Sequence, residues 1–300
     1  MNPEPPPSAA ASDAARAYSD GHPLDEVRYR EYKVILRAER FATATSFREF
    51  ARIARRAAGE LDVALFKDEI SDNRIREVMF YDTPAFDLYN RSFMLRRRTP
   101  YRDGWPADES ELVLKFRHPE QPVAAAVDVR PTRPGSGRVK FKEELLCLRE
   151  GLGGIRSLFS HGCNLDVPRT LPGPRLGDAV HLFPVLDRLV LVPETPIAIV
   201  NELHVEEVLA DIGELHFGHG VEAGASIAVW RHRGTGEPMV GEFAYQIKFR
   251  HADDLHRKAR KRADDFFRII QTAARDWVKL GVTKTGLVYG RGGAAVTNHE

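Results

Sequence analysis

The sequence has few cysteines and no long apolar run. Cys147 and Cys163 are the two cysteines among 300 residues, and they do not form a CxxC pair. This spacing fits neither a disulfide framework nor a metal knuckle, and it favours a reducing compartment. No apolar run approaches the ~20 residues that a transmembrane helix needs, and the N-terminus lacks the basic-then-apolar order of a signal peptide. We therefore expect a soluble, cytoplasmic protein without a membrane partner.

Net charge is also nearly absent. The formal net charge is +1 at pH 7 and the pI is about 7.9, so no overall field attracts nucleic acid or an acidic membrane. Any basic site must therefore be a local concentration of charge. Apolar residues are plentiful by contrast, since 43% of the chain is hydrophobic and it contains sixteen Phe and three Trp. That is enough for a sizeable core.

Composition separates one long middle segment from two short ends. Residues 1–24 are rich in Pro, Ala and Ser and show no periodicity, so we expect a disordered leader. Residues 291–300 follow a glycine-rich stretch and are expected to form a flexible tail. Residues 25–290 are expected to form a single domain. Within it, residues 150–196 contain Gly and Pro breaks and are either an inserted subdomain or a long connection.

Two helices have clear periodic signals. A capping-box spacing at Ser46–Glu49 precedes apolar residues at helical intervals, which predicts a helix over about 46–61. Apolar residues that step by three and four predict a long C-terminal helix over about 252–280. Short helices are also possible near 155–160 and 175–183.

Strands are expected wherever charged and apolar residues alternate with period two. In the first, over about 28–40, Glu31 and Lys33 share one face while Tyr32 and Val34 share the other. A strand usually turns its apolar side to a core, so the charged residues form a separate face. Further strands are expected over 76–81, 92–98, 111–117, 138–145, 197–206, 213–218, 225–232 and 239–249.

The polar faces of these strands are strongly positive although the whole chain is not. Over an open sheet such charges would be screened within about 10 Å. Around the inside of a closed barrel they would repel one another unless a polyanion filled the space. Carboxylates among them would then be oxygen ligands for Mg²⁺ or Mn²⁺, which bridges phosphate oxygens. The nine cations are Lys33, Arg37, Arg96, Arg98, Lys115, Arg117, Lys140, Lys142 and Lys248, and the three carboxylates are Glu31, Glu144 and Glu242.

A series of short motifs carries a resemblance to a known family. In chain order they are Glu31-Tyr-Lys33, Phe80-Tyr-Asp-Thr-Pro84 with Leu88, Leu95-Arg-Arg-Arg98, Leu114-Lys115 and Glu242. Their order and spacing, spread over about 28–250, resemble the CYTH-type family of triphosphate tunnel metalloenzymes. The resemblance implies an α+β fold in which an antiparallel, eight-stranded β-barrel forms a tunnel with flanking helices. It also implies a triphosphate-containing substrate and a divalent metal.

Two positions depart from the family pattern. The opening signature of the family is Glu-x-Glu-x-Lys, whereas Tyr29 precedes Glu31 here. The late Glu-x-Glu pair is likewise reduced to Glu242 followed by Ala244. Each missing carboxylate removes charge that a metal ion needs. Glu144, or a glutamate at 202 or 206, is a possible replacement.

These features leave three functions open. The first is hydrolysis of a triphosphate or polyphosphate, with Glu31 and Lys33 as catalytic residues and Glu31, Glu144 and Glu242 as ligands of Mg²⁺ or Mn²⁺. The second is a non-catalytic module that binds polyphosphate or nucleotide in the cationic tunnel. The third is cyclisation of ATP, because class IV adenylyl cyclases share the family with inorganic, thiamine and RNA triphosphatases. In each, the nine cations of the strand faces bind the phosphates.

Other candidate sites are weaker. Cys163 follows His161 without a recognisable oxyanion arrangement. The basic cluster Lys258–Arg262 is expected to be a solvated helix face, and nucleic-acid binding through it is the less favoured alternative. Lys284, beyond the long helix, either reaches a tunnel mouth or belongs to a loop that ends the helix, and the loop explains it well enough. A histidine-based metal site is also conceivable but is expected to be polar surface, and its members would be His204, Glu214, His216, His219 and His232.

Overall fold

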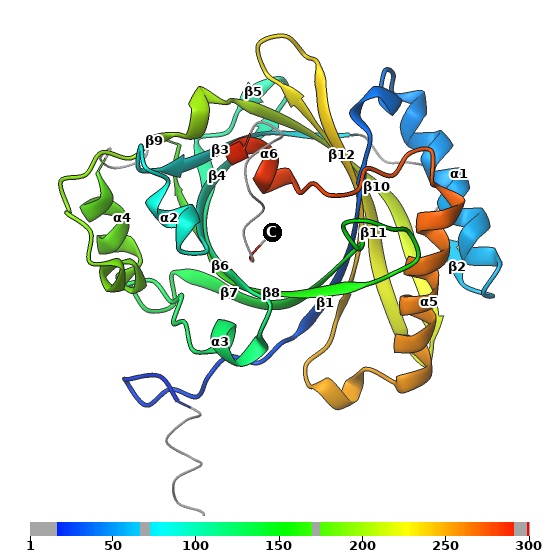
Figure 1. Ribbon diagram of the computed structural model, residues 1–300, viewed down its shortest axis with the longest axis horizontal. Helices are drawn as coiled ribbons and strands as arrows, with labels where there is room; N and C mark the ends of the chain where they lie inside the picture. The colour runs from blue at the N-terminus through cyan, green and yellow to red at the C-terminus, as the bar shows by residue number, and fades with distance from the viewer. Residues whose placement is uncertain (1–16, 67–72, 170–174, 291–298, 300) are drawn as a thin grey trace, which may run out of the picture.

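A closed ring of strands forms the centre of the computed structural model, which describes residues 17–66, 73–169, 175–290 and 299 (Figure 1). Twelve strands form one sheet, and nine of them close the ring in the order β1–β12–β11–β10–β3–β4–β6–β8–β7 and back to β1. The ring strands are β1 (Tyr29–Leu36), β3 (Arg74–Asp82), β4 (Phe93–Arg102), β6 (Glu109–His118), β7 (Gly137–Leu146), β8 (Arg156–Pro168), β10 (Val205–Gly218), β11 (Val221–His232) and β12 (Pro238–Lys248). The short strands β2 (Ala64–Phe66), β5 (Trp105–Pro106) and β9 (Ala198–Ile199) add to it.

The ring corrects the sequence prediction in its strand count and in one pairing. The α+β class and the mainly antiparallel sheet are as expected, but nine strands rather than eight close the ring. β1 and β7 run parallel, whereas the other ring neighbours are antiparallel. β8 covers the stretch 155–160 that was predicted as a short helix. Its Ser160–Asn164 segment, without a β-branched residue, carries little of the composition that identifies a strand.

Helices cover the outside of the ring. α1 (Thr45–Gly59) and α5 (Arg257–Ala273) lie over β10–β12, and α6 (Lys284–Gly290) lies within the outline of the ring in Figure 1. On the opposite side lie α2 (Asp87–Asn90), α3 (Gln121–Ala125) and α4 (Leu176–Leu182). α1 and α4 confirm the helices predicted over 46–61 and 175–183. Among the described residues, no helix has the length and hydropathy to cross a bilayer.

The C-terminal helix is shorter than the predicted 252–280. It begins after His256, whose side chain accepts a hydrogen bond from the Lys258 backbone N–H, and it ends at Ala273. Residues 274–277 form turns, and Val278 then bridges Leu36 beside the end of β1, where Lys279 donates its N–H to the Ile35 carbonyl oxygen at 2.9 Å. The apolar period continues past the helix because this segment also packs on the core, with Trp277 and Val278 buried.

The largest apolar core lies outside the ring, between β10–β12 and the two long helices. Tyr32 of β1 points into it and stacks on Tyr245 of β12, with ring centroids 4.4 Å apart. Phe50 of α1 packs on Phe243 at 5.3 Å in the same core. Since Tyr32 faces outward, Glu31 and Lys33 on either side of it face inward. The alternation predicted for the first strand is therefore confirmed.

The termini lie partly outside the described residues. The predicted leader, 1–24, is described from residue 17 onward, and there Tyr18 is buried and donates a hydrogen bond from its hydroxyl to Asp25 at 2.9 Å. Of the predicted tail, 291–300, residue 299 alone is described. Residues 150–196, left open as a subdomain or a connection, contain β8 and α4, so β8 makes part of this stretch integral to the ring.

Gly162 of β8 provides a test of how closely the ring is packed. A Cβ atom at this position would lie 2.7 Å from the Leu114 carbonyl oxygen, whereas one at Gly224, on the inner face of β11, would meet nothing within 4 Å. We expect Gly162→Ala to lower the free energy of unfolding by about 1–3 kcal/mol, because the neighbouring backbone must shift. Gly224→Ala is the matched control and should change it by no more than about 0.5 kcal/mol. Urea denaturation measures both, and equal effects would contradict this packing.

Candidate functional site: a cationic cavity inside the ring

The ring encloses a cavity of about 850 Å³. Small side chains such as Ser226, Ala228 and Ala244 lie among its lining residues and leave the centre of the ring open. Among the described residues, the charged lining consists of twelve cations and four glutamates, an excess of eight positive charges. The cations are Lys33, Arg76, Arg96, Arg98, Lys115, Arg117, Lys140, Lys142, Arg149, Arg156, Lys279 and Lys284, and the glutamates are Glu31, Glu144, Glu207 and Glu242.

The cavity brings together most of the residues that the sequence pattern singled out. The three predicted glutamates and seven of the nine predicted cations line it, and Arg37 and Lys248 are the two that do not. Arg37 lies just past the end of β1 and donates from Nε to the Val278 carbonyl oxygen at 3.0 Å. Lys248 is the last residue of β12 and is exposed.

Several lining residues were missed as site residues by sequence reasoning. Glu207 lies opposite Arg76 in the pairing of β10 with β3, one residue beyond the strand predicted over 197–206. Glu206, weighed as a replacement carboxylate, instead pairs with Arg231 and is absent from the lining. The predicted strand ended before Glu207 and so left it out, and Glu206 lies on the opposite face because side chains alternate along a strand. Lys284 lines the cavity, in keeping with the tunnel-mouth alternative.

Glu144 is the centre of the first charge cluster. Its side chain is 1% exposed and contacts Lys33 Nζ at 2.8 Å, Arg117 Nη2 at 3.1 Å and Lys115 Nζ at 3.4 Å. Burial alone would raise the pKa of Glu144, but the three cations outweigh it and hold the pKa well below its usual range. Burial lowers the pKa of Lys115. The negative charge of Glu144 raises this pKa by less than burial lowers it, so it stays well below its ordinary value. The cluster therefore has one fixed negative charge among three positive ones.

Lys33 joins Glu144 to a second carboxylate. Glu31 lies opposite Glu144 in the parallel pairing of β1 and β7, and its Oε2 is also 2.8 Å from Lys33 Nζ. Lys142 contacts the other oxygen of Glu31 at 3.1 Å. Burial raises the pKa of Glu31, but Lys142 and Lys33 lower it more, so the carboxylate stays ionised. The ammonium of Lys33 thus occupies the space between two facing carboxylates.

Glu207 is the centre of the second cluster. It is paired with Arg76, accepts a hydrogen bond from Trp230 Nε1 at 2.8 Å, and lies 3.4 Å from Lys284 Nζ. Burial would raise the pKa of Glu207, but Arg76 and Lys284 hold it well below its usual range. Lys284 also contacts Glu242 at 2.7 Å, so one lysine of α6 connects β10 with β12. This lysine fixes the C-terminal segment against the ring.

Arg96 differs from the paired cations. Its Nε and Nη2 atoms are buried and have no hydrogen-bond partner in the described part of the chain. Burial and the neighbouring Arg98 guanidinium lower the pKa of Arg96 well below its ordinary value. The guanidinium carbon of Arg96 lies over the ring of Phe80, 5.6 Å from its centroid. A buried guanidinium without an acceptor is costly, so the arrangement suits an anion that supplies oxygen atoms to Arg96.

The glutamates of the cavity do not form a ready-made binding site for a divalent metal. Lys33 lies between Glu31 and Glu144, and Glu242 is paired with Lys284 instead. Among the described residues, no three carboxylate, histidine or cysteine ligand atoms converge inside the cavity. The residues as they stand therefore do not fit the Mg²⁺ or Mn²⁺ that the family resemblance implies.

The weaker candidate formed by Cys163 and His161 does not have the geometry of a reactive site. Cys163 is buried, and burial raises the pKa of its thiol to about 11, which disfavours the thiolate that a nucleophile needs. His161 is turned to the Ala124 carbonyl oxygen at 3.1 Å and to Asp25 at 3.2 Å.

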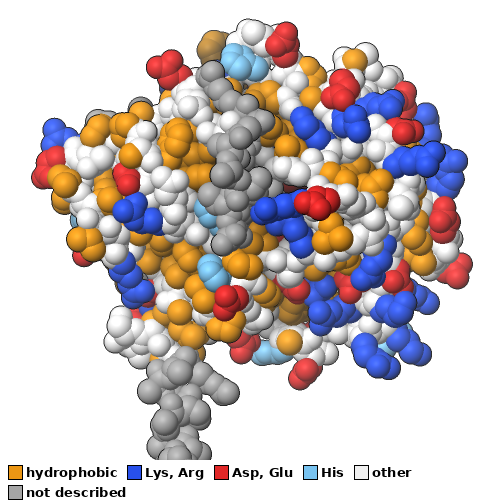
Figure 2. Space-filling model, viewed as in Figure 1, with side chains coloured by type: hydrophobic (Ala, Val, Ile, Leu, Met, Phe, Trp, Pro, Cys, Tyr) orange, Lys and Arg blue, Asp and Glu red, His pale blue; other side chains and the backbone are white. Residues whose placement is uncertain are grey.

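The basic cluster Lys258–Arg262 belongs to α5, on the side of the molecule where Figure 2 shows basic side chains on the outer surface. Within the cluster, Lys261 pairs with Asp265 and Arg262 donates to the Phe217 carbonyl oxygen. These contacts fit the expectation of a solvated helix face.

Comparison with known proteins finds distant structural neighbours. No family model matches the chain, and no curated protein matches it. HpAC1 from Hippeastrum, described as having a dominant triphosphatase activity, is 11% identical, with 91% of this chain and 100% of that chain covered and a TM-score of 0.44. PH1819 from Pyrococcus horikoshii is 15% identical, with 87% and 99% covered and a TM-score of 0.36. The Pct1 RNA triphosphatase of S. pombe is 11% identical, with 86% and 77% covered and a TM-score of 0.25. Two of these descriptions name a triphosphatase.

Replacing Glu144 tests the balance of charge in the cavity. We expect Glu144→Gln to lower the free energy of unfolding at pH 7 by about 3–5 kcal/mol, because three buried cations lose their counter-charge. Glu49→Gln, an exposed change on α1, is the control and should have little effect. The difference in free energy of unfolding between the variant and wild type should shrink as pH falls below about 4.3. In that range Glu144 becomes protonated in the unfolded chain but stays ionised in the folded protein. Chemical denaturation across pH measures this, and equal stability of the two proteins at pH 7 would contradict the role given to Glu144.

Proposed function

We propose that the protein binds a linear polyphosphate, either free or as the triphosphate of a larger molecule, inside the ring. The observation that carries this proposal is that the Nε and Nη2 atoms of Arg96 have no hydrogen-bond partner among the described residues, within a cavity whose described lining holds twelve cations and four glutamates. An anion that reaches Arg96 gains hydrogen bonds that the described residues do not supply. It also offsets the excess positive charge of the lining.

The distribution of the cations favours an extended anion over a single phosphate. Lys33, Lys115 and Arg117 surround Glu144, whereas Arg76 and Lys284 surround Glu207. These clusters come from different strands and from α6, so cations face the cavity from several sides. The cavity of about 850 Å³ lies within the ~300–1,000 Å³ usual for small-molecule sites. A chain of several phosphates matches both the size and the charge.

Binding in this arrangement does not depend on a divalent metal. The position between Glu31 and Glu144 is held by Lys33, whose ammonium supplies the positive charge there. Lysine and arginine donate hydrogen bonds to phosphate oxygens directly, and arginine does so through two parallel bonds. The lysines and arginines of the chain therefore supply the hydrogen-bond donors that the phosphate oxygens need.

Hydrolysis of the bound triphosphate is a second candidate function. The observation that favours it is that Glu31 and Glu144 face each other, because Mg²⁺ is commonly held by one or two carboxylates together with phosphate oxygens. As the residues stand, Lys33 occupies this place and the two carboxylates do not fit a metal, so hydrolysis by this route requires Lys33 to move away from them.

Substitution of Arg96 tests the proposed binding. We expect Arg96→Ala to weaken tripolyphosphate binding by about 10- to 100-fold, the range expected for lost hydrogen bonds between charged groups. Arg52→Ala on the exposed face of α1 removes the same charge far from the cavity and should leave the affinity unchanged. Isothermal titration calorimetry with EDTA present measures the affinity without divalent ions. Equal losses in both variants, or no binding by wild type in EDTA, would refute the proposal.

An assay of turnover separates the two candidate functions. Tripolyphosphate, thiamine triphosphate and ATP are each incubated with the protein and Mg²⁺ or Mn²⁺, and phosphate, pyrophosphate and cyclic AMP are measured. Phosphate release that disappears in Glu31→Gln supports hydrolysis. Cyclic AMP with pyrophosphate would instead identify the cyclase activity left open by the sequence. Tight binding without any product leaves the protein as a binding module.

A further inference from the structure

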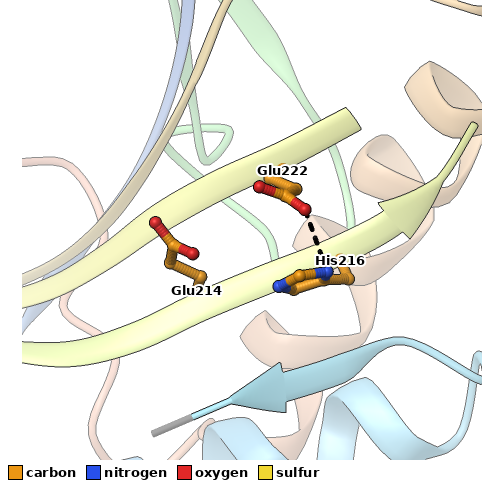
Figure 3. Close-up of side chains that lie close together, drawn as sticks. All are labelled: Glu214, His216 and Glu222. Carbon is orange, nitrogen blue, oxygen red and sulfur yellow. Dashed lines mark ion pairs between the residues drawn. The ribbon is translucent and has the colours of Figure 1, made fainter. Parts of the chain in front are cut away.

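Three metal-ligating side chains converge outside the cavity, near the end of the β10–β11 hairpin. Glu214 and His216 come from β10 and Glu222 from β11, and Figure 3 shows their polar ends gathered above the two strands. One ligand atom from each lies within 4.8 Å of the other two. His216 Nδ1 is already 3.2 Å from Glu222 Oε1.

A β-bulge places the three residues on one face. Asp211 lies opposite Ser226, whereas Gly213 lies opposite Ala225, so β10 contains one extra residue at this point. Beyond the bulge, His216 lies directly opposite Glu222. Directly opposed residues of antiparallel strands point to the same side, and Glu214 is two residues from His216 on that side. The convergence is therefore fixed by the register of two strands.

The charges of this cluster differ from those of the cavity. Each glutamate in the cavity contacts at least one lysine or arginine. Glu222 contacts His216, and neither Glu214 nor Glu222 is paired with a lysine or arginine among the described residues. Two carboxylates and an imidazole thus lie together without a lysine or arginine paired with them among the described residues. The negative charge of the two glutamates is therefore not neutralised by a basic side chain.

The surroundings keep the cluster open to ions and orient the histidine. The side chains of His216 and Glu222 are 35% and 54% exposed, so an ion reaches them from solvent. The ring of Phe66 on β2 packs edge-on against the imidazole, with centroids 4.7 Å apart. This contact restricts rotation of the imidazole ring while its nitrogen atoms remain available.

We propose that Glu214, His216 and Glu222 bind a divalent transition-metal ion such as Zn²⁺. One imidazole nitrogen and two carboxylate oxygens are ligands that Zn²⁺ accepts, at about 2.0–2.2 Å from the ion and hence about 3.3 Å from one another. The separation of His216 and Glu222 already matches this spacing. Glu214 has to move by no more than ~1.5 Å, which is within reach of its exposed side chain. Water occupies the remaining position. None of the three residues lines the cavity, so this site is separate from the proposed polyphosphate site.

Zinc titration of the tag-free, phosphate-free protein tests the site. We expect one Zn²⁺ per chain by calorimetry, and a loss of affinity of at least ~10-fold in both His216→Ala and Glu214→Gln. His219→Ala is the matched control, because His219 lies on the same hairpin and stacks on His256 with centroids 3.7 Å apart. It should leave Zn²⁺ affinity unchanged, and Arg96→Ala should do the same. Thermal unfolding without metal verifies that each variant is folded.

The result can overturn the assignment in two ways. Zinc binding that survives in His216→Ala but is lost in His219→Ala would place the ion on the His219–His256 pair. Absence of stoichiometric binding by the wild-type protein at up to 1 mM Zn²⁺ would show that the three side chains do not form a metal site. A failure of tripolyphosphate binding has no bearing on either result, since the two sites share no residue.

Discussion

Repulsion among like charges inside a closed ring is the constraint on which the structure depends. Twelve cations share a cavity with four glutamates, and two unit charges 4 Å apart interact by about 4 kcal/mol at an effective dielectric constant of 20. Glu144 and Glu207 each neutralise a group of cations and are almost completely buried. The part of the charge that they leave unbalanced makes the cavity receptive to an anion. Stability and ligand affinity therefore depend on the same side chains.

Most of the apolar packing around this cavity lies outside the ring, but a smaller core lies on the inner face, where Ile35, Phe80 and Trp230 form one cluster with Val288 and Tyr289 of α6. Tyr32, Phe50 and Phe243 belong to a core between the ring and α1 with α5, and a second core underlies α2, α3 and α4. Closure of the ring leaves neighbouring ring strands without a free edge, and small residues such as Ala244 prevent side chains from filling its centre. The C-terminal segment completes the wall through Lys284. The period-two pattern of each strand separates an outer apolar face from an inner face that carries the charged residues together with apolar ones such as Ile35 and Val113.

The sequence predicted the inner face better than it predicted the topology. Alternation around Lys33, Lys115 and Lys140 was enough to select residues that line one cavity, because a strand's two faces are read directly from residue order. The β-bulge after Asp211, the parallel pairing of β1 with β7 and the polar strand β8 carry no such local signal. Glu207 was missed because the predicted strand ended one residue before it. Which carboxylate pairs with which lysine depends on contacts between strands far apart in the chain, and periodicity does not contain that information.

A crystal structure of the protein with tripolyphosphate, grown in EDTA, tests the central claim most directly. The account predicts phosphate density inside the ring, with oxygen atoms within hydrogen-bonding distance of Arg96 and without a metal ion between Glu31 and Glu144. Density on the outer face of α5 with an empty ring would contradict it.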